Sequence, residues 1–147
     1  MNALFVDTAG WMACADGADP QHAAAAGARD AALEAGTTLV TTDFVLDETL
    51  TLMRLRLGLA AARRWWRQIE ETRRLRWEWI EAQRFDKARA LFFQYGDKPF
   101  SLTDCTSFVV MRELRLLHAL TTDRHFRQMG FQVRPGGPSR AGRRRRT

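Results

Sequence analysis

Apolar and polar positions divide the chain into short apolar runs and longer segments with a helical period. The first run, Leu4-Phe5-Val6, is aromatic and β-branched and is followed by Asp7, which predicts a buried strand with a carboxylate at its carboxyl end. Later strands are predicted at 37–41, 75–79, 118–122 and 131–133. A short turn or helix is expected at 8–13, and helical spacing or helix caps occur at 20–35, 42–57, 59–72, 82–95, from 101 onward and at 124–129.

Strands and helices alternate in this pattern, an order typical of α/β proteins. It predicts a mostly parallel central sheet with helices on both faces, a three-layer α/β/α arrangement. Gly58 separates two consecutive helices, which we expect to form a helical arm or hairpin. The chain has 147 residues, of which 46% are hydrophobic, enough for one domain with a substantial core.

The second helix of this arm has an apolar stripe that predicts its buried side. Four residues with helical spacing make the stripe: Leu59, Ala62, Trp66 and Ile69. Trp65 lies outside it, so we expect Trp65 to contact a partner. Arginines alternate with tryptophans here and around Trp77, a composition that suits RNA binding, but we expect Trp66, Trp77 and Trp79 to pack in the core.

Positive charge is concentrated at the C-terminal end of the chain. The formal net charge is +6, and six arginines follow Val133: Arg134, Arg140 and Arg143 to Arg146. Residues 1–133 are therefore neutral overall and form the predicted domain. Residues 134–147 contain little that can be buried, so we expect them to be a disordered Arg-rich tail.

Nothing in the sequence suggests export or a membrane. No apolar run approaches the roughly 20 residues of a membrane helix, and no basic segment precedes the first strand. The two cysteines, Cys14 and Cys105, lack metal-ligand spacing, and a chain with a sufficient core needs no disulfide. We therefore expect a cytoplasmic protein.

Four carboxylates occur where predicted strands end or helices begin: Asp7, Glu48, Asp104 and Asp123. Each has a structural explanation by itself, such as an N-cap or the helix macrodipole. However, strand carboxyl ends and helix N-termini share one edge of a parallel sheet, so the four should meet there. Two unit charges about 4 Å apart repel by about 4 kcal/mol at an effective dielectric near 20, so this cluster requires a counter-charge. Oxygen ligands favour Mg²⁺, or Mn²⁺, over Zn²⁺ and suggest phosphodiester hydrolysis.

The sequence around these acids resembles the four motifs of PIN-domain nucleases. In chain order the motifs are Val6-Asp7-Thr8, Val45-Leu46-Asp47-Glu48-Thr49, Ser101-Leu102-Thr103-Asp104-Cys105 and Thr121-Thr122-Asp123-x-x-Phe126. Their order and spacing are similar to those of VapC-type toxins over about residues 3–133. The resemblance implies a PIN-like fold and a Mg²⁺-dependent endoribonuclease that hydrolyses RNA phosphodiester bonds.

The resemblance also implies roles for individual residues. Asp7 and Asp104 would hold the principal ion, whereas Glu48 and Asp123 would complete the site or hold a second ion. Asp97 is a candidate supporting acid. Threonines beside the acids are candidates to orient water or RNA phosphate: Thr8, Thr103 and Thr122.

In the resembling family the helical arm receives an antitoxin segment and contributes to a homodimer, which implies the toxin of a toxin–antitoxin pair. Two alternatives remain open: a PIN nuclease of RNA maturation without a toxin role, and a non-catalytic module that binds RNA or a partner. The intact acidic quartet favours an enzyme, because a binding protein has no need of clustered like charges. We expect the histidines to be structural or solvated: His22, His118 and His125.

Overall fold

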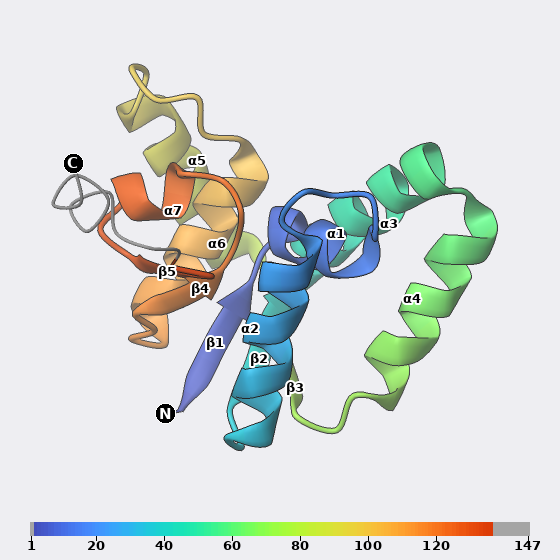
Figure 1. The fold of residues 1–147 in the computed structure, drawn as a ribbon. Coiled ribbons are helices and arrows are strands. Elements are labelled where there is room, and N and C mark those ends of the chain that lie inside the picture. Colours follow the sequence, from blue (N-terminus) through green and yellow to red (C-terminus); the bar gives the residue numbers. More distant parts are fainter. Residues whose placement is uncertain (1, 137–147) are drawn as a thin grey trace, which may run out of the picture.

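A five-stranded sheet forms the centre of the computed structural model, which describes residues 2–136 (Figure 1). The strands are β1 Ala3–Val6, β2 Thr38–Thr42, β3 Leu75–Glu78, β4 His118–Leu120 and β5 Gln132–Arg134. All of their pairings are parallel, and their order across the sheet is β3-β2-β1-β4-β5. The predicted α/β class with a parallel sheet is therefore confirmed.

Helices cover both faces of this sheet. Within the described residues they are α1 Thr8–Ala15, α2 His22–Glu34, α3 Asp43–Leu57, α4 Leu59–Glu71, α5 Ala82–Gln94, α6 Leu102–Glu113 and α7 His125–Gln128. Figure 1 shows α1, α2 and α4 on one side and α5, α6 and α7 on the other. Helix α3 contacts α1, α4 and α6, so it joins the two helical layers. The predicted three-layer arrangement with a helical arm, α3 and α4, is confirmed.

Local sequence signals account for where several helices begin and end. The Thr42 hydroxyl accepts a hydrogen bond from the Val45 amide and caps α3. Ser101 and Asp104 form a reciprocal capping box at the start of α6. Gly58 has a φ of 95°, a conformation that favours glycine, and it separates α3 from α4. The Thr42 and Ser101 caps fix the first turns of α3 and α6, the two helices that bring Glu48 and Asp104 to the carboxyl edge of the sheet.

The tryptophans form a continuous series from the core to the surface, which corrects two expectations. Trp65 is only 4% exposed and packs edge-on against Trp11 of α1, so the expectation that Trp65 lies outside the buried face is wrong. The reason is that α4 turns this side chain toward α1. Trp66 and Trp77 are half-buried and in contact, and they pack against the edge of the core rather than inside it. Trp79, directly after the edge strand β3, is 58% exposed and stacks on Trp77, so its expected core position is wrong.

The folded part of the chain extends slightly beyond the predicted boundary at 133. Arg134 belongs to β5, and its carbonyl accepts a hydrogen bond from the Thr121 amide. The predicted tail from residue 137 onward lies outside the described residues, so its disorder stays a prediction. In the part of the chain that the structure describes, every helix is too short or too polar to cross a membrane.

Candidate active site

A cavity of about 270 Å³ lies at the carboxyl edge of the sheet. Asp7 follows β1 and Asp123 follows β4, whereas Glu48 and Asp104 come from the N-terminal parts of α3 and α6. All four predicted acids line this cavity. They meet because parallel strands end, and the following helices begin, at the same edge of the sheet.

Asp7 is the most deeply buried of the four acids, with 4% of its surface exposed. Its Oδ1 accepts a hydrogen bond from the Gly10 amide at 2.8 Å and thereby caps α1, and its Oδ2 accepts one from the Thr121 hydroxyl at 2.8 Å. Burial, and next the nearby carboxylate of Asp123, raise the pKa of Asp7 well above its usual range. The two hydrogen bonds oppose this rise without cancelling it. A cation in the cavity would therefore stabilise the ionised form of Asp7.

Asp104 is fixed at the start of α6 by the capping box. Its amide donates to the Ser101 hydroxyl at 2.9 Å, and its Oδ2 accepts from the Ser101 amide at 3.0 Å. The same Oδ2 lies 2.8 Å from Nδ1 of His125. Burial raises the pKa of Asp104, and the carboxylate of Asp123 adds to this rise, whereas the hydrogen bonds from Ser101 and His125 oppose it. Asp104 thus combines its helix-capping role with a place in the acidic cluster.

Asp123 lies in the turn between β4 and α7. Its amide donates to the Thr121 hydroxyl at 3.2 Å, and its Oδ1 accepts from the His125 amide at 2.9 Å. Possible ligand atoms of Asp104, Asp123 and His125 all lie within 4.8 Å of one another. The expectation of a structural or solvated His125 therefore missed its place beside two acids.

Glu48 reaches the cavity from α3, together with Leu52 and Arg56. The spacing of four residues places these three side chains on one face of the helix. Arg56 brings a guanidinium to a cavity lined by carboxylates, and the sequence interpretation missed this residue. The signal was present, because Arg56 follows Glu48 by eight residues on a predicted helix.

The three candidate threonines, Thr8, Thr103 and Thr122, all line the cavity. Thr8 is 8% exposed, and its hydroxyl is buried without a hydrogen-bond partner in the structure. Such groups are rare in folded proteins, so this hydroxyl is available to a ligand. Asp97, in contrast, has a side chain that is 73% exposed and pairs with Lys98 at 3.4 Å. The expectation that Asp97 supports the site is therefore wrong.

The donor set of the cavity fits a hard divalent cation. Carboxylate oxygens are the ligands that Mg²⁺ and Mn²⁺ prefer, and four carboxylates face this space. The raised pKa values of Asp7 and Asp104 show that the surrounding protein groups do not offset the cost of charging them. A bound cation would supply that compensation.

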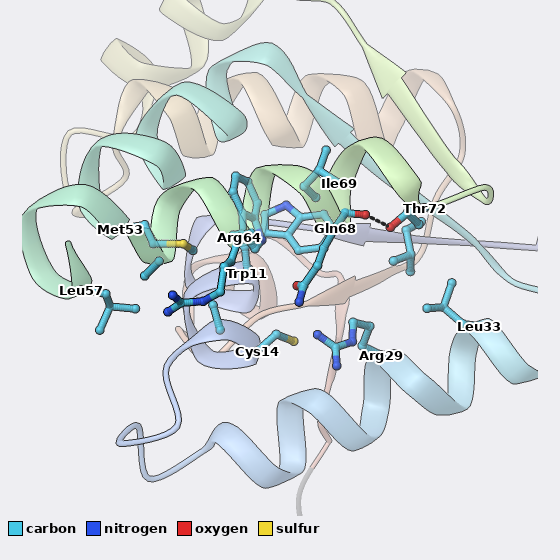
Figure 2. A pocket seen from close by; sticks show the side chains of 14 residues that line it. Trp11, Cys14, Arg29, Leu33, Met53, Leu57, Arg64, Gln68, Ile69 and Thr72 are labelled. Atoms are coloured by element: carbon cyan, nitrogen blue, oxygen red, sulfur yellow. Dashed lines mark hydrogen bonds between the residues drawn. The ribbon is translucent and has the colours of Figure 1, made fainter. Parts of the chain in front are cut away.

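A second and larger cavity, of about 360 Å³, shares no lining residue with the acidic one. Figure 2 shows this groove between α4 and the pair α1 and α2. Trp11, Met53 and Ile69 contribute apolar surface, whereas Arg29 of α2 and Arg64 of α4 extend toward the space from opposite sides. The groove therefore has an apolar wall with cations along it.

The parallel α/β/α fold and the acids at its carboxyl edge define the class of protein. A family model described as the PIN domain matches residues 4–132, and the chain therefore belongs to the PIN-domain family.

The chain is similar to one particular member of this family over nearly its whole length. It is 31% identical over 137 residues to the 23S rRNA-specific endonuclease VapC20 of Mycobacterium tuberculosis, in each of two strains, with 90% of this chain and 98% of the relative covered. The crystal structure of Mycobacterium tuberculosis VapC20, described as a sarcin-ricin loop cleaving toxin, matches this fold with a TM-score of 0.77 and 30% identity. That match covers 88% of this chain and 96% of the other. The resemblance to PIN-domain ribonucleases of the VapC type is confirmed.

Proposed function

We propose that this chain is the toxin of a VapBC-type toxin–antitoxin pair and acts in the cytoplasm as a metal-dependent endoribonuclease. The observation that carries the proposal is the meeting of four acids, from four separate segments, in one cavity at the sheet edge. Structural capping explains Asp7 and Asp104 singly, but it gives no reason for like charges to converge. Similarity to the rRNA endonuclease VapC20 supports RNA as the substrate.

Asp7 and Asp104 are proposed to hold the principal Mg²⁺ ion, for which Mn²⁺ can substitute, and Glu48 and Asp123 complete the site. When bound, such a cation stabilises negative charge on phosphate oxygens and lowers the pKa of water. Glu48 lines the same cavity and is less buried than Asp7, so its carboxylate is open to water and is proposed to accept the proton released by the attacking water.

The other polar groups of the cavity are proposed to bind the RNA backbone. Arg56 is placed to pair with a phosphate, since a guanidinium binds two phosphate oxygens at once. The unpartnered hydroxyl of Thr8 can donate to a phosphate oxygen or to water. Thr103 and Thr122 line the same cavity and can serve the same purpose.

The groove in Figure 2 is the proposed binding site of the antitoxin. An amphipathic segment would place its apolar side chains against Trp11 and Ile69, and its acidic side chains against Arg29 and Arg64. We also propose a homodimer, because exposed apolar side chains remain elsewhere on the surface, such as Phe93, which is 74% exposed. Sedimentation of the purified chain, alone and with the antitoxin, measures both assemblies.

A cleavage assay with matched variants tests the enzymatic proposal. The full chain, freed of any partner, is incubated with 23S rRNA in Mg²⁺, in Mn²⁺ or in EDTA. We expect cleavage only with a metal, and a loss of about a hundredfold or more in Asp7→Asn and Asp104→Asn. Asp97→Asn is the control, because that carboxylate is exposed and lies outside the cavity. Undiminished cleavage by Asp7→Asn and Asp104→Asn, or cleavage in EDTA, contradicts the proposal.

Expression in a bacterial host separates the toxin from the two alternatives. A toxin arrests growth when expressed alone, its antitoxin relieves the arrest, and Asp7→Asn abolishes it. A nuclease of RNA maturation cleaves RNA in the assay but does not arrest growth. A binding module retains RNA without cutting it, with or without metal.

A further inference from the structure

His125 does not line the acidic cavity, but its side chain contacts two of the acids that do. Its Nδ1 is 2.8 Å from Oδ2 of Asp104 and 3.8 Å from Oδ2 of Asp123. These two acids belong to different elements, α6 and the turn before α7. One imidazole nitrogen is therefore close to both of two carboxylates whose charges repel each other.

The hydrogen bond from His125 has a definite direction. Oδ2 of Asp104 already accepts a hydrogen bond from the Ser101 amide, and an ionised carboxylate only accepts. When Asp104 is ionised, as a metal ligand is, Nδ1 of His125 therefore carries the proton and donates it. Among the described residues, Oδ1 of Asp104 has no hydrogen-bond partner, so this oxygen is left for a ligand in the cavity.

The imidazole is itself held in place from two directions. The His125 amide donates to Oδ1 of Asp123 at 2.9 Å, which fixes the backbone of the turn. The ring packs edge-on against Phe100, with centroids 5.7 Å apart, and Phe100 is only 6% exposed. The donor to Asp104 is thus preorganised by packing.

We propose that His125 is a positioning residue for the metal site, which orients Asp104 through its Nδ1 proton and holds Asp104 and Asp123 together. Groups that hydrogen-bond to metal-ligating side chains fix their orientation, and losing such a group typically weakens metal affinity roughly 10–100-fold. His125 acts through Asp104 and does not need to touch RNA. Its catalytic consequence rests on the proposed function, whereas its effect on metal binding can be measured without any substrate.

Three substitutions distinguish a positioning role from a general structural one. His125→Asn keeps an amide nitrogen near the place of Nδ1, His125→Gln puts its amide nitrogen near the place of Nε2, and His125→Ala removes both. The matched control is His22→Ala, because His22 is also half-buried and its Nδ1 lies 2.8 Å from a carbonyl oxygen, that of Ala13, outside the acidic cavity. Each full-length protein is titrated with Mn²⁺ by calorimetry, its fold is checked by circular dichroism, and RNA cleavage is measured across a range of Mn²⁺ concentrations.

We expect Mn²⁺ affinity to fall roughly 10–100-fold in His125→Ala and His125→Gln and to stay within about threefold of the parent in His125→Asn and His22→Ala. Excess Mn²⁺ should restore cleavage by His125→Ala, with an unchanged KM for RNA. Parental affinity in folded His125→Ala or His125→Gln overturns the proposal. The proposal is also overturned if folded His125→Asn binds Mn²⁺ as weakly as His125→Gln does, because the imidazole would then be a metal ligand itself. If the parent binds Mn²⁺ but cleaves no RNA, the proposed function fails and the Mn²⁺ titrations still decide the role of His125.

Discussion

Replacing Asp7 with asparagine separates a metal ligand from a helix cap. Asparagine can still accept a hydrogen bond from the Gly10 amide, and its own amide can donate to the Thr121 oxygen, so the cap of α1 survives. What disappears is a charge that is only 4% exposed and lies near the carboxylates of Asp123 and Asp104. The substitution therefore removes electrostatic cost and keeps the local hydrogen bonds.

Two opposing terms set the stability of the metal-free variant. Exchanging charge-assisted hydrogen bonds for neutral ones costs about 1 kcal/mol. Removing a buried, uncompensated charge returns several kcal/mol, because the effective desolvation penalty of a buried ion has about that size. We therefore expect metal-free Asp7→Asn to be more stable than the parent at neutral pH by about 1 kcal/mol or more.

Mg²⁺ should reverse this order. An ion that binds only the folded parent stabilises it by about 2.7 kcal/mol at one hundred times its Kd, and this increment falls to about 0.4 kcal/mol if the substitution weakens binding about a hundredfold. For a domain of this size 1 kcal/mol corresponds to roughly 3–5 °C in Tm. The expected Mg²⁺ shift is therefore roughly 10 °C for the parent and about 1–2 °C for Asp7→Asn.

The pH dependence of the metal-free proteins provides an independent check. Because the pKa of Asp7 is raised in the folded state, the folded parent binds a proton more tightly than the unfolded chain does. This contribution to stability is complete below the unfolded carboxyl pKa of about 3.9 and is lost as the pH rises through the folded pKa. The parent should thus lose stability relative to Asp7→Asn above about pH 4, and the two should converge in acid.

Thermal melts of both proteins, with and without Mg²⁺ and from acid to neutral pH, measure these quantities beside the RNA cleavage assay. Asp43→Asn is the control: its carboxylate accepts a hydrogen bond from the Ile80 amide at 2.8 Å, but it lies outside the cavity. That variant should keep the full Mg²⁺ shift. An Asp7→Asn protein that melts well below the metal-free parent, yet keeps its Mg²⁺ shift and cleaves RNA, would refute the metal-ligand role.

Three further predictions concern substrate binding and the core. Arg56→Ala should raise the KM for RNA more than it lowers kcat, and it should reduce the salt dependence of RNA binding by about one phosphate contact. Arg54→Ala, outside the cavity, should have neither effect. Steady-state kinetics and filter binding at several salt concentrations measure both. Trp65→Ala should lower the free energy of unfolding by about 3–5 kcal/mol in denaturant melts, and Trp79→Ala by less than about 1 kcal/mol, since only Trp65 is buried. Truncation after Gly136 removes five arginines and should weaken RNA binding and flatten its salt dependence without changing Tm.

The sequence was sufficient to predict the sheet and the meeting of the four acids, because both follow from element order. Once strands and helices alternate, parallel pairing brings every strand end to one edge, and the acids after β1 and β4 must converge there. The position of Trp65 did not follow from such a rule. Two overlapping faces of α4 satisfy the apolar spacing, and only the contact with Trp11, 54 positions earlier in the chain, selects the face that contains Trp65.

His125 and Asp97 show where spacing along the chain stops being informative about the site. His125 meets Asp104 across 21 residues, and this contact depends on how α7 packs against α6. The local sequence around His125 or Asp104 contains no pattern that predicts this contact. Asp97 precedes α6 by a few residues, but the loop directs its side chain into solvent beside Lys98. Strand and helix ends are predictable positions, whereas side chains in the intervening turns require the packed structure.

Gly10, in the first turn of α1, lies where this helix approaches the end of β4 most closely. A Cβ atom on Gly10 would lie 2.2 Å from the carbonyl oxygen and 2.9 Å from the carbonyl carbon of Leu120, so the first turn of α1 packs directly against the end of β4. The Gly10 amide also donates to Asp7, and the Asp7 amide donates to the Leu120 carbonyl at 3.4 Å. Gly10→Ala must therefore separate α1 from β4 and displace Asp7 and Thr121 together.

Gly10→Ala should destabilise the protein by about 1–3 kcal/mol or more, although alanine by itself favours a helix by about 1 kcal/mol. Gly27→Ala in α2 is the matched control, because nothing lies within 4 Å of its added Cβ, and it should stabilise the protein by about 0.5–1 kcal/mol. Denaturant melts give both values, and the Mg²⁺ shift in Tm shows whether Asp7 has moved: we expect it to shrink in Gly10→Ala and to persist in Gly27→Ala. Equal stability of the two variants would mean that α1 can move away from β4 at no cost, and the close approach would then not be what fixes Asp7 at the sheet edge.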